Sequence, residues 1–443
     1  MIDVHEKTLH RYANILLGIF FFYLIGPTFR LLNAYISDYL FLLFALHVFF
    51  GPLKVKFNFK EARIFLIPCV VILVVTIGKL LSGSELFIDE FANNVNYLKM
   101  YLMFCFTYSI ILQIKDVDFL DRYLKNIFRL LAIGVIFVSL ISIMQFLNFK
   151  IVDTIIENFY LVQHKTLKTT NLDQYNTTNR VVGIFDSYNG CGFFMCFFTF
   201  FLIIVFSELR SKISLLAIIL GFITLILTSN RASLITFILM NIIFFVFIKR
   251  ITNFKVILSF GFLIILFLYV GTYVSDFISI GNLNRFLEVK DFIDKGQVPF
   301  TFADRTNAWE WMPQYILSSR YAIFGFTTSG FMNDLNFRSP DNQYLTWFVN
   351  YGIIGAVSLC TWTIYTFIKL IKLYKEEALT KNDSLIHITG GFIVIWIGLS
   401  IEGISQDSFF GNRWREYFVF IIAAFAALKF FRTPHITANK ISG

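Results

Sequence analysis

Arginine is the residue type whose placement in this sequence points most directly to chemistry. A guanidinium group stays charged and binds a phosphate through two parallel hydrogen bonds. Several arginines gathered on one side therefore suit a diphosphate ligand, although any one of them in a polar segment is equally well explained by solvation. By the charge pattern described below, nine share one side of the molecule: Arg30, Arg180, Arg231, Arg285, Arg305, Arg320, Arg338, Arg413 and Arg415.

Arg231 is the hardest of these to explain by solvation. It lies in residues 229–233, whose sequence Ser-Asn-Arg-Ala-Ser is the only polar break between two apolar runs. A charge so close to hydrocarbon is costly and is usually functional. The alternative is a side chain that reaches back to the polar interface.

Arg305 begins a second segment of interest, which has helical periodicity. Trp309, Met312 and Ile316 recur on one helical face, which predicts a short amphipathic helix lying on a membrane interface. Trp309 could stack on a sugar ring or belong to an interfacial aromatic belt. Arg320 follows this helix.

A carboxylate, Asp341, stands where the next apolar run begins, close in sequence to Arg338. An ionised carboxylate can act as general base and accept the proton of a sugar hydroxyl. Aspartate is also a favoured N-cap, because its side chain accepts hydrogen bonds from the first N–H groups of a helix. The spacing alone leaves both readings open.

Other chemistries find little support. The Asp116-Val117-Asp118 segment matches the acidic pair of metal-dependent nucleotide-sugar transferases, but it lies in a short loop with no nucleotide-binding pattern around it. The six histidines show no ligand spacing, and no phosphate-binding loop or serine-hydrolase motif is found. The five cysteines contain no Cys-x-x-Cys pair and are interpreted as buried apolar residues. We expect no metal and no cofactor.

The composition determines which elements must position these residues. Of 443 residues, 57% are hydrophobic and 15% charged, and the mean hydropathy is +0.69. A soluble domain has about 25% charged residues, so the sequence predicts one integral all-α membrane domain over 1–443. Twelve apolar runs approach the roughly 17–25 residues that cross a bilayer: 13–33, 36–52, 64–81, 97–114, 127–147, 191–206, 213–229, 232–248, 256–275, 343–368, 385–403 and 415–430.

Charge sets the orientation, because cytoplasmic loops are rich in lysine and arginine. One set of loops, with both termini, carries 22 basic and 10 acidic residues, and the other carries 16 and 19. The first set is therefore predicted to be cytoplasmic, and the net charge of +9 needs no nucleic-acid partner. The two long loops, 148–190 and 276–341, are then external. Loops of this length are usually functional, which predicts external chemistry.

Four segments contain short motifs, and the order of these motifs along the chain is informative. Residues 180–189 contain an arginine and a glycine before a span, residues 228–233 form the arginine-containing turn, and residues 305–325 belong to the second long loop. In residues 341–355, Asp341 and Asn342 are followed by nine residues and a Gly-x-x-Gly pattern. Together these segments resemble the bacterial O-antigen polymerase (Wzy-type) and O-antigen ligase superfamily of integral membrane glycosyltransferases, in which ligases carry histidine at the position of Asp341.

The resemblance implies a GT-C-like helical fold, with short helices in the external loops, and transfer of a lipid-diphosphate-linked oligosaccharide without a nucleotide sugar. Asp341 would be the base, with Glu402 or Asp407 as the alternative, and Arg231 and Arg305 would stabilise the leaving diphosphate. Further contacts to the diphosphate or the glycan are expected from Arg180, Arg320, Arg338, Trp309, Asn342 and Tyr344.

The departure at Asp341 favours a polymerase over a ligase, and both remain open. The expected partners are undecaprenyl-diphosphate-linked oligosaccharides, membrane lipid and a chain-length regulator protein. The expected location is the bacterial inner membrane, with a periplasmic active site and cytoplasmic termini. A flippase or transporter is a third possibility, but it would need charges deep within spans and internal repeats. The span interiors are nearly free of charged residues, and no internal repeat is evident.

Overall fold

The computed structural model describes residues 2–27, 30–31, 34–51, 55–58, 63–81, 88–160, 181–185, 187–250, 300–319, 321–326, 342–380, 383–405 and 414–432. These residues form helices and one antiparallel hairpin of two-residue strands, β1 (Arg30–Leu31) and β2 (Ala34–Tyr35). Six helices are long and apolar enough to cross a membrane, and five more apolar helices are shorter. The predicted all-α polytopic membrane fold is confirmed.

The helices follow the predicted spans closely. They are α1 (Ile2–Ile25), α2 (Ile36–Phe50), α3 (Arg63–Leu81), α4 (Ile88–Leu112), α5 (Val117–Phe146), α6 (Lys150–Ile155) with the π-helix η1 (Ile156–Tyr160), α8 (Tyr188–Leu209), α9 (Lys212–Leu227), α10 (Arg231–Ile243) with the π-helix η2 (Phe244–Ile248), α13 (Phe300–Leu317), α15 (Gln343–Thr380), α16 (Asp383–Ser405) and α17 (Trp414–Arg432). Eleven of the twelve spans coincide with helices, and the span at 256–275 lies outside the described residues.

Several helix ends differ from the predicted bounds. Helix α5 begins at Val117 rather than at 127, and α15 continues to Thr380 rather than ending at 368. The first span was expected at 13–33, but α1 ends at Ile25. Gly26 and Pro27 follow it, and the Gly26 N–H closes the last turn on the carbonyl of Phe22 at 2.8 Å. Proline cannot continue a helix because it lacks an N–H and clashes with the preceding turn.

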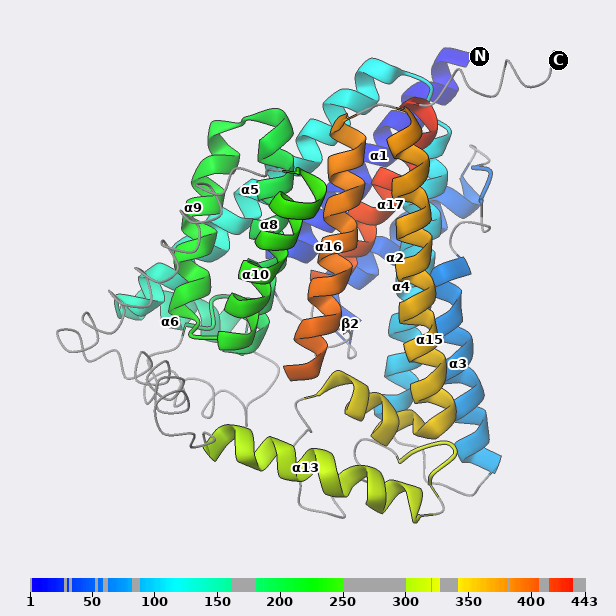
Figure 1. Ribbon diagram of the computed structural model, residues 1–443. Coiled ribbons are helices and arrows are strands. Elements are labelled where there is room, and N and C mark those ends of the chain that lie inside the picture. The colour runs from blue at the N-terminus through cyan, green and yellow to red at the C-terminus, as the bar shows by residue number, and fades with distance from the viewer. Residues whose placement is uncertain are drawn as a thin grey trace.

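Helix α8 lies at the centre of the bundle. Five sixths of its span is buried, and it packs against α9, α10, α16 and α5 (Figure 1). Phe193, Phe194, Phe198 and Phe200 are all almost fully buried. A helix that is apolar on every side has to be enclosed by other helices or by lipid, so the richness in phenylalanine fits this central position.

The segments singled out for chemistry gather at one end of the bundle. In Figure 1, α13 crosses the lower end, where α9 ends, α10 begins and α16 ends. The start of α1 and the end of α17 lie at the opposite, upper end. This common end is the one that the charge pattern predicts to be external.

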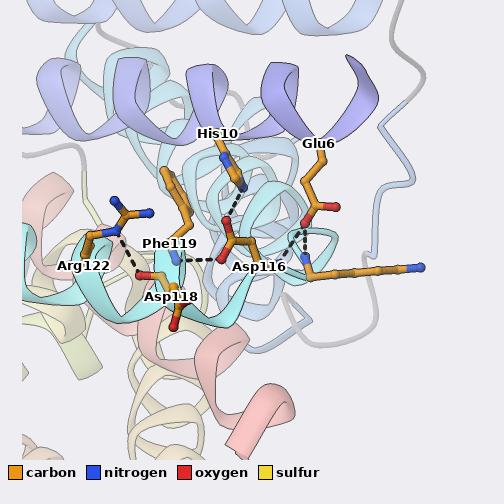
Figure 2. A network of polar contacts seen from close by, with 7 residues as sticks. Glu6, His10, Asp116, Asp118, Phe119 and Arg122 are labelled. Atoms are coloured by element: carbon orange, nitrogen blue, oxygen red, sulfur yellow. Dashed lines mark hydrogen bonds and ion pairs between the residues drawn. The ribbon is translucent and has the colours of Figure 1, made fainter. Parts of the chain in front are cut away.

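The acidic pair Asp116 and Asp118 begins α5 at the other end of the bundle (Figure 2). Asp116 is the N-cap, since its Oδ1 accepts a 2.9 Å hydrogen bond from the Phe119 N–H. Glu6 of α1 accepts from the backbone N–H groups of residues 115 and 116. The ring of His10 stacks on Phe119 with centroids 3.8 Å apart. Asp116 therefore has a structural role as the cap of α5.

Candidate functional site

The turn between α9 and α10 presents Arg231 at the first position of a helix. Ser229 has a φ of 51°, and Asn230 caps α10 by accepting a 3.2 Å hydrogen bond from the Ser233 N–H. The N-terminus of a helix carries partial positive charge, so a cation there is unfavourable unless an anion accompanies it. Arg231 and the start of α10 thus place two sources of positive charge side by side.

The segment 181–185 lies against this turn. The Val181 N–H reaches the carbonyl of Leu227, at the end of α9, over 3.4 Å. The buried Gln145 of α5 accepts hydrogen bonds from the N–H groups of Val182 and Gly183 at 3.0 and 3.1 Å. The structure thus brings the chain just after Arg180 next to the turn that carries Arg231.

Gly183 has a physical reason to be glycine. Its φ is +57°, and a Cβ there would lie 2.7 Å from the Ser142 hydroxyl oxygen. A side chain would therefore meet both an unfavourable backbone conformation and a steric clash. Arg180 itself lies outside the described residues.

Helix α16 contributes a buried carboxylate to the same region. The Ser233 hydroxyl donates a 2.6 Å hydrogen bond to Glu402 Oε1, and both residues are fully buried. The neighbouring Gly403 packs against the first turn of α15, where a Cβ on the glycine would lie 3.3 Å from the Cβ of Gln343. The Tyr344 hydroxyl donates to the carbonyl of Ser400 at 2.9 Å. The start of α10, the end of α16 and the start of α15 therefore converge.

Helix α15 is capped by Asn342. Its Oδ1 accepts a 3.0 Å hydrogen bond from the Leu345 N–H, and its carbonyl accepts from the Thr346 N–H at 2.8 Å. The N-cap role considered for Asp341 is thus filled by its neighbour. Asp341 lies outside the described residues, immediately before this cap.

Helix α13 confirms that a helix surrounds Trp309, but the face expected to be apolar packs differently from the prediction. Met312 and Ile316 are fully buried, in a cluster with Phe326, Leu345 and Val349, and Trp309 packs at its edge. The expectation that this face rests on the membrane interface is wrong, because the first half of α15 covers it. Arg305 belongs to α13.

A break in α15 creates that first half. Gly352 has φ 62° and ψ −164°, so the element consists of two helices, 343–351 and 353–380. Only glycine adopts this backbone conformation readily. Gly325, with φ +76°, lies against the break, where a Cβ would be 2.5 Å from the Gly352 nitrogen.

The segment 321–326 replaces the helical hydrogen bonds lost at the break. The Phe326 N–H donates to the carbonyl of Val349 at 2.7 Å, and the Ile353 N–H donates to the carbonyl of Ala322 at 2.9 Å. Buried backbone groups need such partners, and membrane proteins tolerate irregular backbone only where protein or water surrounds it. The Gly-x-x-Gly pattern at 352–355 is therefore a helix break with a docked segment.

The structure describes the predicted site residues unequally. It describes the side chains of four of them: Arg231, Asn342, Tyr344 and Trp309. Of Arg305 it describes the backbone alone. The remaining four lie outside the described residues: Arg180, Arg320, Arg338 and Asp341. Within the described ranges, no group of three His, Cys, Asp or Glu side chains could hold a metal ion.

Three further residues were not chosen from the sequence: Gln145, Ser233 and Lys79. Glu402 was considered only as a substitute base. One feature of the sequence, a single polar residue within an apolar run, marks three of these four residues. Lys79 is the only charge in the run 64–81, Glu402 is the only acid in 385–403, and Gln145 is the only amide in 127–147. Polar groups isolated in apolar spans are expensive and tend to be functional. Ser233 has no such signal.

A comparison with known protein families matches the part of the chain that contains the Arg231 turn and the broken helix α15. A family model described as O-antigen ligase matches residues 216–360, about a third of the chain. The match runs from α9 through the Arg231 turn and α13 to the broken helix α15. Among curated proteins, no sequence matches the chain.

Proposed function

Because residues 216–360 carry the O-antigen ligase domain of the O-antigen ligase and polymerase superfamily, we propose that this multi-pass membrane enzyme is a polysaccharide polymerase. Its donor is a growing glycan on undecaprenyl diphosphate, and its acceptor is a repeat unit on a second such lipid. The reaction takes place at the external, periplasmic face of the bacterial inner membrane. A chain-length regulator protein is a proposed partner.

The observation that carries this proposal is the convergence of three chain segments around the start of α10. The chain just after Arg180 contacts the end of α9 beside Arg231, and the first turn of α15 is joined to the start of α10 through the end of α16. An arrangement that binds an anion and lies next to the helix that follows Asp341 suits a sugar diphosphate and the hydroxyl that attacks it.

In the proposed reaction, the acceptor hydroxyl oxygen bonds to the anomeric carbon of the donor sugar as the bond from that carbon to the diphosphate oxygen breaks. Asp341 takes the hydroxyl proton. The leaving undecaprenyl diphosphate keeps the electron pair, and its charge is stabilised by arginines. Donors aimed at charge that develops in the transition state are worth about 2.7–4 kcal/mol each.

The remaining residues bind the substrates. Arg180, Arg231, Arg305 and Arg320 bind the diphosphate, which allows the reaction to proceed without a metal. The glycan contacts come from Trp309, Arg338, Asn342 and Tyr344. Of these, Asn342 caps α15 and Tyr344 joins it to α16, so they shape the site as well as line it.

Asp341 is preferred to Glu402 as the base because of access. Glu402 is fully buried and accepts the Ser233 hydroxyl proton in a hydrogen bond. A general base has to come within about 2.6–3.2 Å of the proton that it removes. Glu402 instead connects α16 to the start of α10 and so supports the anion-binding turn.

An O-antigen ligase, which transfers the same glycan to lipid A-core, is the second candidate. The description of the matching family favours it, whereas aspartate at position 341 in place of the ligase histidine favours the polymerase. The acid–base and leaving-group roles are the same in both reactions, and only the acceptor differs.

A deletion strain analysed by lipopolysaccharide gel separates the two functions. Loss of a polymerase leaves core bearing a single repeat unit, which is the result we expect. Loss of a ligase leaves core without any repeat. An unchanged ladder in the deletion strain would exclude both.

A further inference from the structure

Lys79 is a buried cation inside the bundle, near the end of α3. Its side chain is 1% exposed. The ammonium group donates hydrogen bonds to two backbone carbonyls, of Phe326 at 2.8 Å and of Asn350 at 2.6 Å. It also lies 5.9 Å from the centroid of the Tyr351 ring. Both carbonyls belong to the segments that meet at the break in α15.

The helix break explains why a cation is needed there. Carbonyls in the last turn before a break lose their helical donors, and a buried carbonyl without a donor is costly. The carbonyl of Val349 accepts a hydrogen bond from the Phe326 N–H. The Lys79 ammonium group donates to the carbonyls of both Asn350 and Phe326. Hydrogen bonds from a charged donor are about twice as strong as neutral ones. Lys79 thus ties three elements together: α3, the segment 321–326 and the first half of α15.

Two of these elements, the segment 321–326 and the first half of α15, form a unit with α13 that has its own apolar cluster. Met312, Ile316, Phe326, Leu345 and Val349 pack together in this cluster, whereas Trp347 and Tyr351 of the half-helix 343–351 belong to the main core of the bundle. The unit comprises α13, the segment 321–326 and the half-helix 343–351, and it lies at the lower end of Figure 1, beside α3. It carries Arg305, and its half-helix begins just after Asp341 and Asn342 in the sequence, whereas Arg231 belongs to a different element.

From this arrangement we propose that Lys79 is a positioning residue, which fixes the unit carrying Arg305 and leading to Asp341 against the bundle and so aligns it with Arg231. The inference rests on the proposed function. Lys79 does not contact the substrate. It acts through the backbone of α15, and its loss misplaces the base while the binding turn at Arg231 stays intact.

Lys99 provides a matched control. It is also a largely buried lysine of the bundle, on α4, and it forms a 2.9 Å ion pair with Asp38. Asp38 in turn accepts the Tyr23 hydroxyl at 2.7 Å. These partners lie on α1 and α2, away from the break. Lys99→Met and Lys79→Met therefore remove the same group from two different places.

The test combines a distance with kinetics in the purified full-length protein. Spin labels are attached to cysteines at Leu81, the exposed end of α3, and at Ser318, the exposed end of α13, after the five native cysteines are replaced. We expect Lys79→Met to shift or broaden this distance and Lys99→Met to leave it unchanged. With donor lipid as substrate, Lys79→Met should lower kcat by about 100-fold and change KM by less than about threefold, since misplacement by about 1 Å costs that much rate.

An unchanged distance in Lys79→Met overturns the inference, whatever the activity. A changed distance with normal kcat also overturns it, because the unit then needs no fixing. If Lys79→Met gives no folded protein, Gly352→Ala disturbs the same junction from the α15 side and is judged by the same two measurements. If the wild-type protein transfers no glycan, the proposed function fails, and the labels alone decide whether Lys79 fixes the unit.

Discussion

Ser233 and Glu402 are 169 residues apart in the sequence and share a 2.6 Å hydrogen bond in the interior of the bundle. The serine lies one turn after the Asn230 cap, and the glutamate lies near the end of α16. The bond therefore fixes the start of α10, with Arg231, to the helix against which α15 begins. A buried carboxylate is costly unless it is hydrogen-bonded, so we assign this pair to holding the site together.

Ser233→Ala tests that role. Removing a donor from a buried carboxylate costs about 1–3 kcal/mol, so the melting temperature in detergent should fall by several degrees, and activity should fall with it. Thr236→Ala, one turn further along the buried face of α10, is the control and should lower the melting temperature less.

Glu402→Gln tests whether Glu402 is the base. It keeps an acceptor for Ser233, so it should retain activity within about tenfold. A loss of 10² or more in Glu402→Gln would identify Glu402 as the base instead.

Arg231→Lys separates phosphate binding from simple charge. Lysine keeps the charge but loses the two parallel hydrogen bonds of the guanidinium group. If these stabilise the leaving diphosphate, kcat/KM should fall by the equivalent of about 2–4 kcal/mol. Arg122→Lys is the control, because Arg122 donates to the carbonyl of Asp118 at the opposite end of the bundle. Equal activities of the two variants, at equal expression, would make Arg231 a solvated residue.

Gly352→Ala tests the helix break itself. A Cβ at this position would lie 2.3 Å from the carbonyl oxygen of Ile323, and φ is +62°. Strained backbone of this kind costs about 1–3 kcal/mol, so thermal unfolding should occur at a clearly lower temperature. Gly18→Ala is the matched control, since nothing lies within 4 Å of its added Cβ in α1. There alanine should stabilise the helix by up to about 1 kcal/mol. Equal melting temperatures for both variants would mean that α15 can straighten at no cost.

The spans could be predicted because apolar content alone specifies them, and α8 is recognisable from its phenylalanines. The site could be predicted only in part. Arg231 is conspicuous as a charge between two apolar runs. The break at Gly352 is not, because it depends on segment 321–326, which docks there only in the folded chain. Lys79, at the end of an apolar run, resembles a lysine that reaches the interface, and its carbonyl partners are 247 and 271 residues away in sequence.

Cysteine labelling tests the orientation. Ser318 is exposed at the end of α13, and the excess of basic residues on the opposite side predicts that this end faces outward. A cysteine at Ser318 should react with an impermeant maleimide in cells whose outer membrane alone is permeabilised. A cysteine at exposed Lys372, in the part of α15 beyond the break, should be protected. The reverse pattern would invert the topology and remove the external site.

Asp341→Asn tests the proposed base, and the structure sharpens the test. Asn342 caps α15, so exchanging Asp341 for its amide should leave the helix, expression and donor-lipid binding intact. Asparagine cannot accept a proton at neutral pH, and loss of a general base typically costs about 10²–10⁴-fold in rate. Chain growth should therefore be nearly abolished.

Two further variants complete the experiment. Asn342→Ala removes the cap and should cost about 0.5–2 kcal/mol of stability, with a much smaller loss of rate than Asp341→Asn. Asp341→His should keep partial activity with an optimum at higher pH, since imidazole accepts a proton only when neutral, above a pKa near 6.5, whereas a carboxylate does so from about pH 4 upward. Near-normal glycan ladders from Asp341→Asn would exclude Asp341 as the base and direct the search to Glu402 and Asp407.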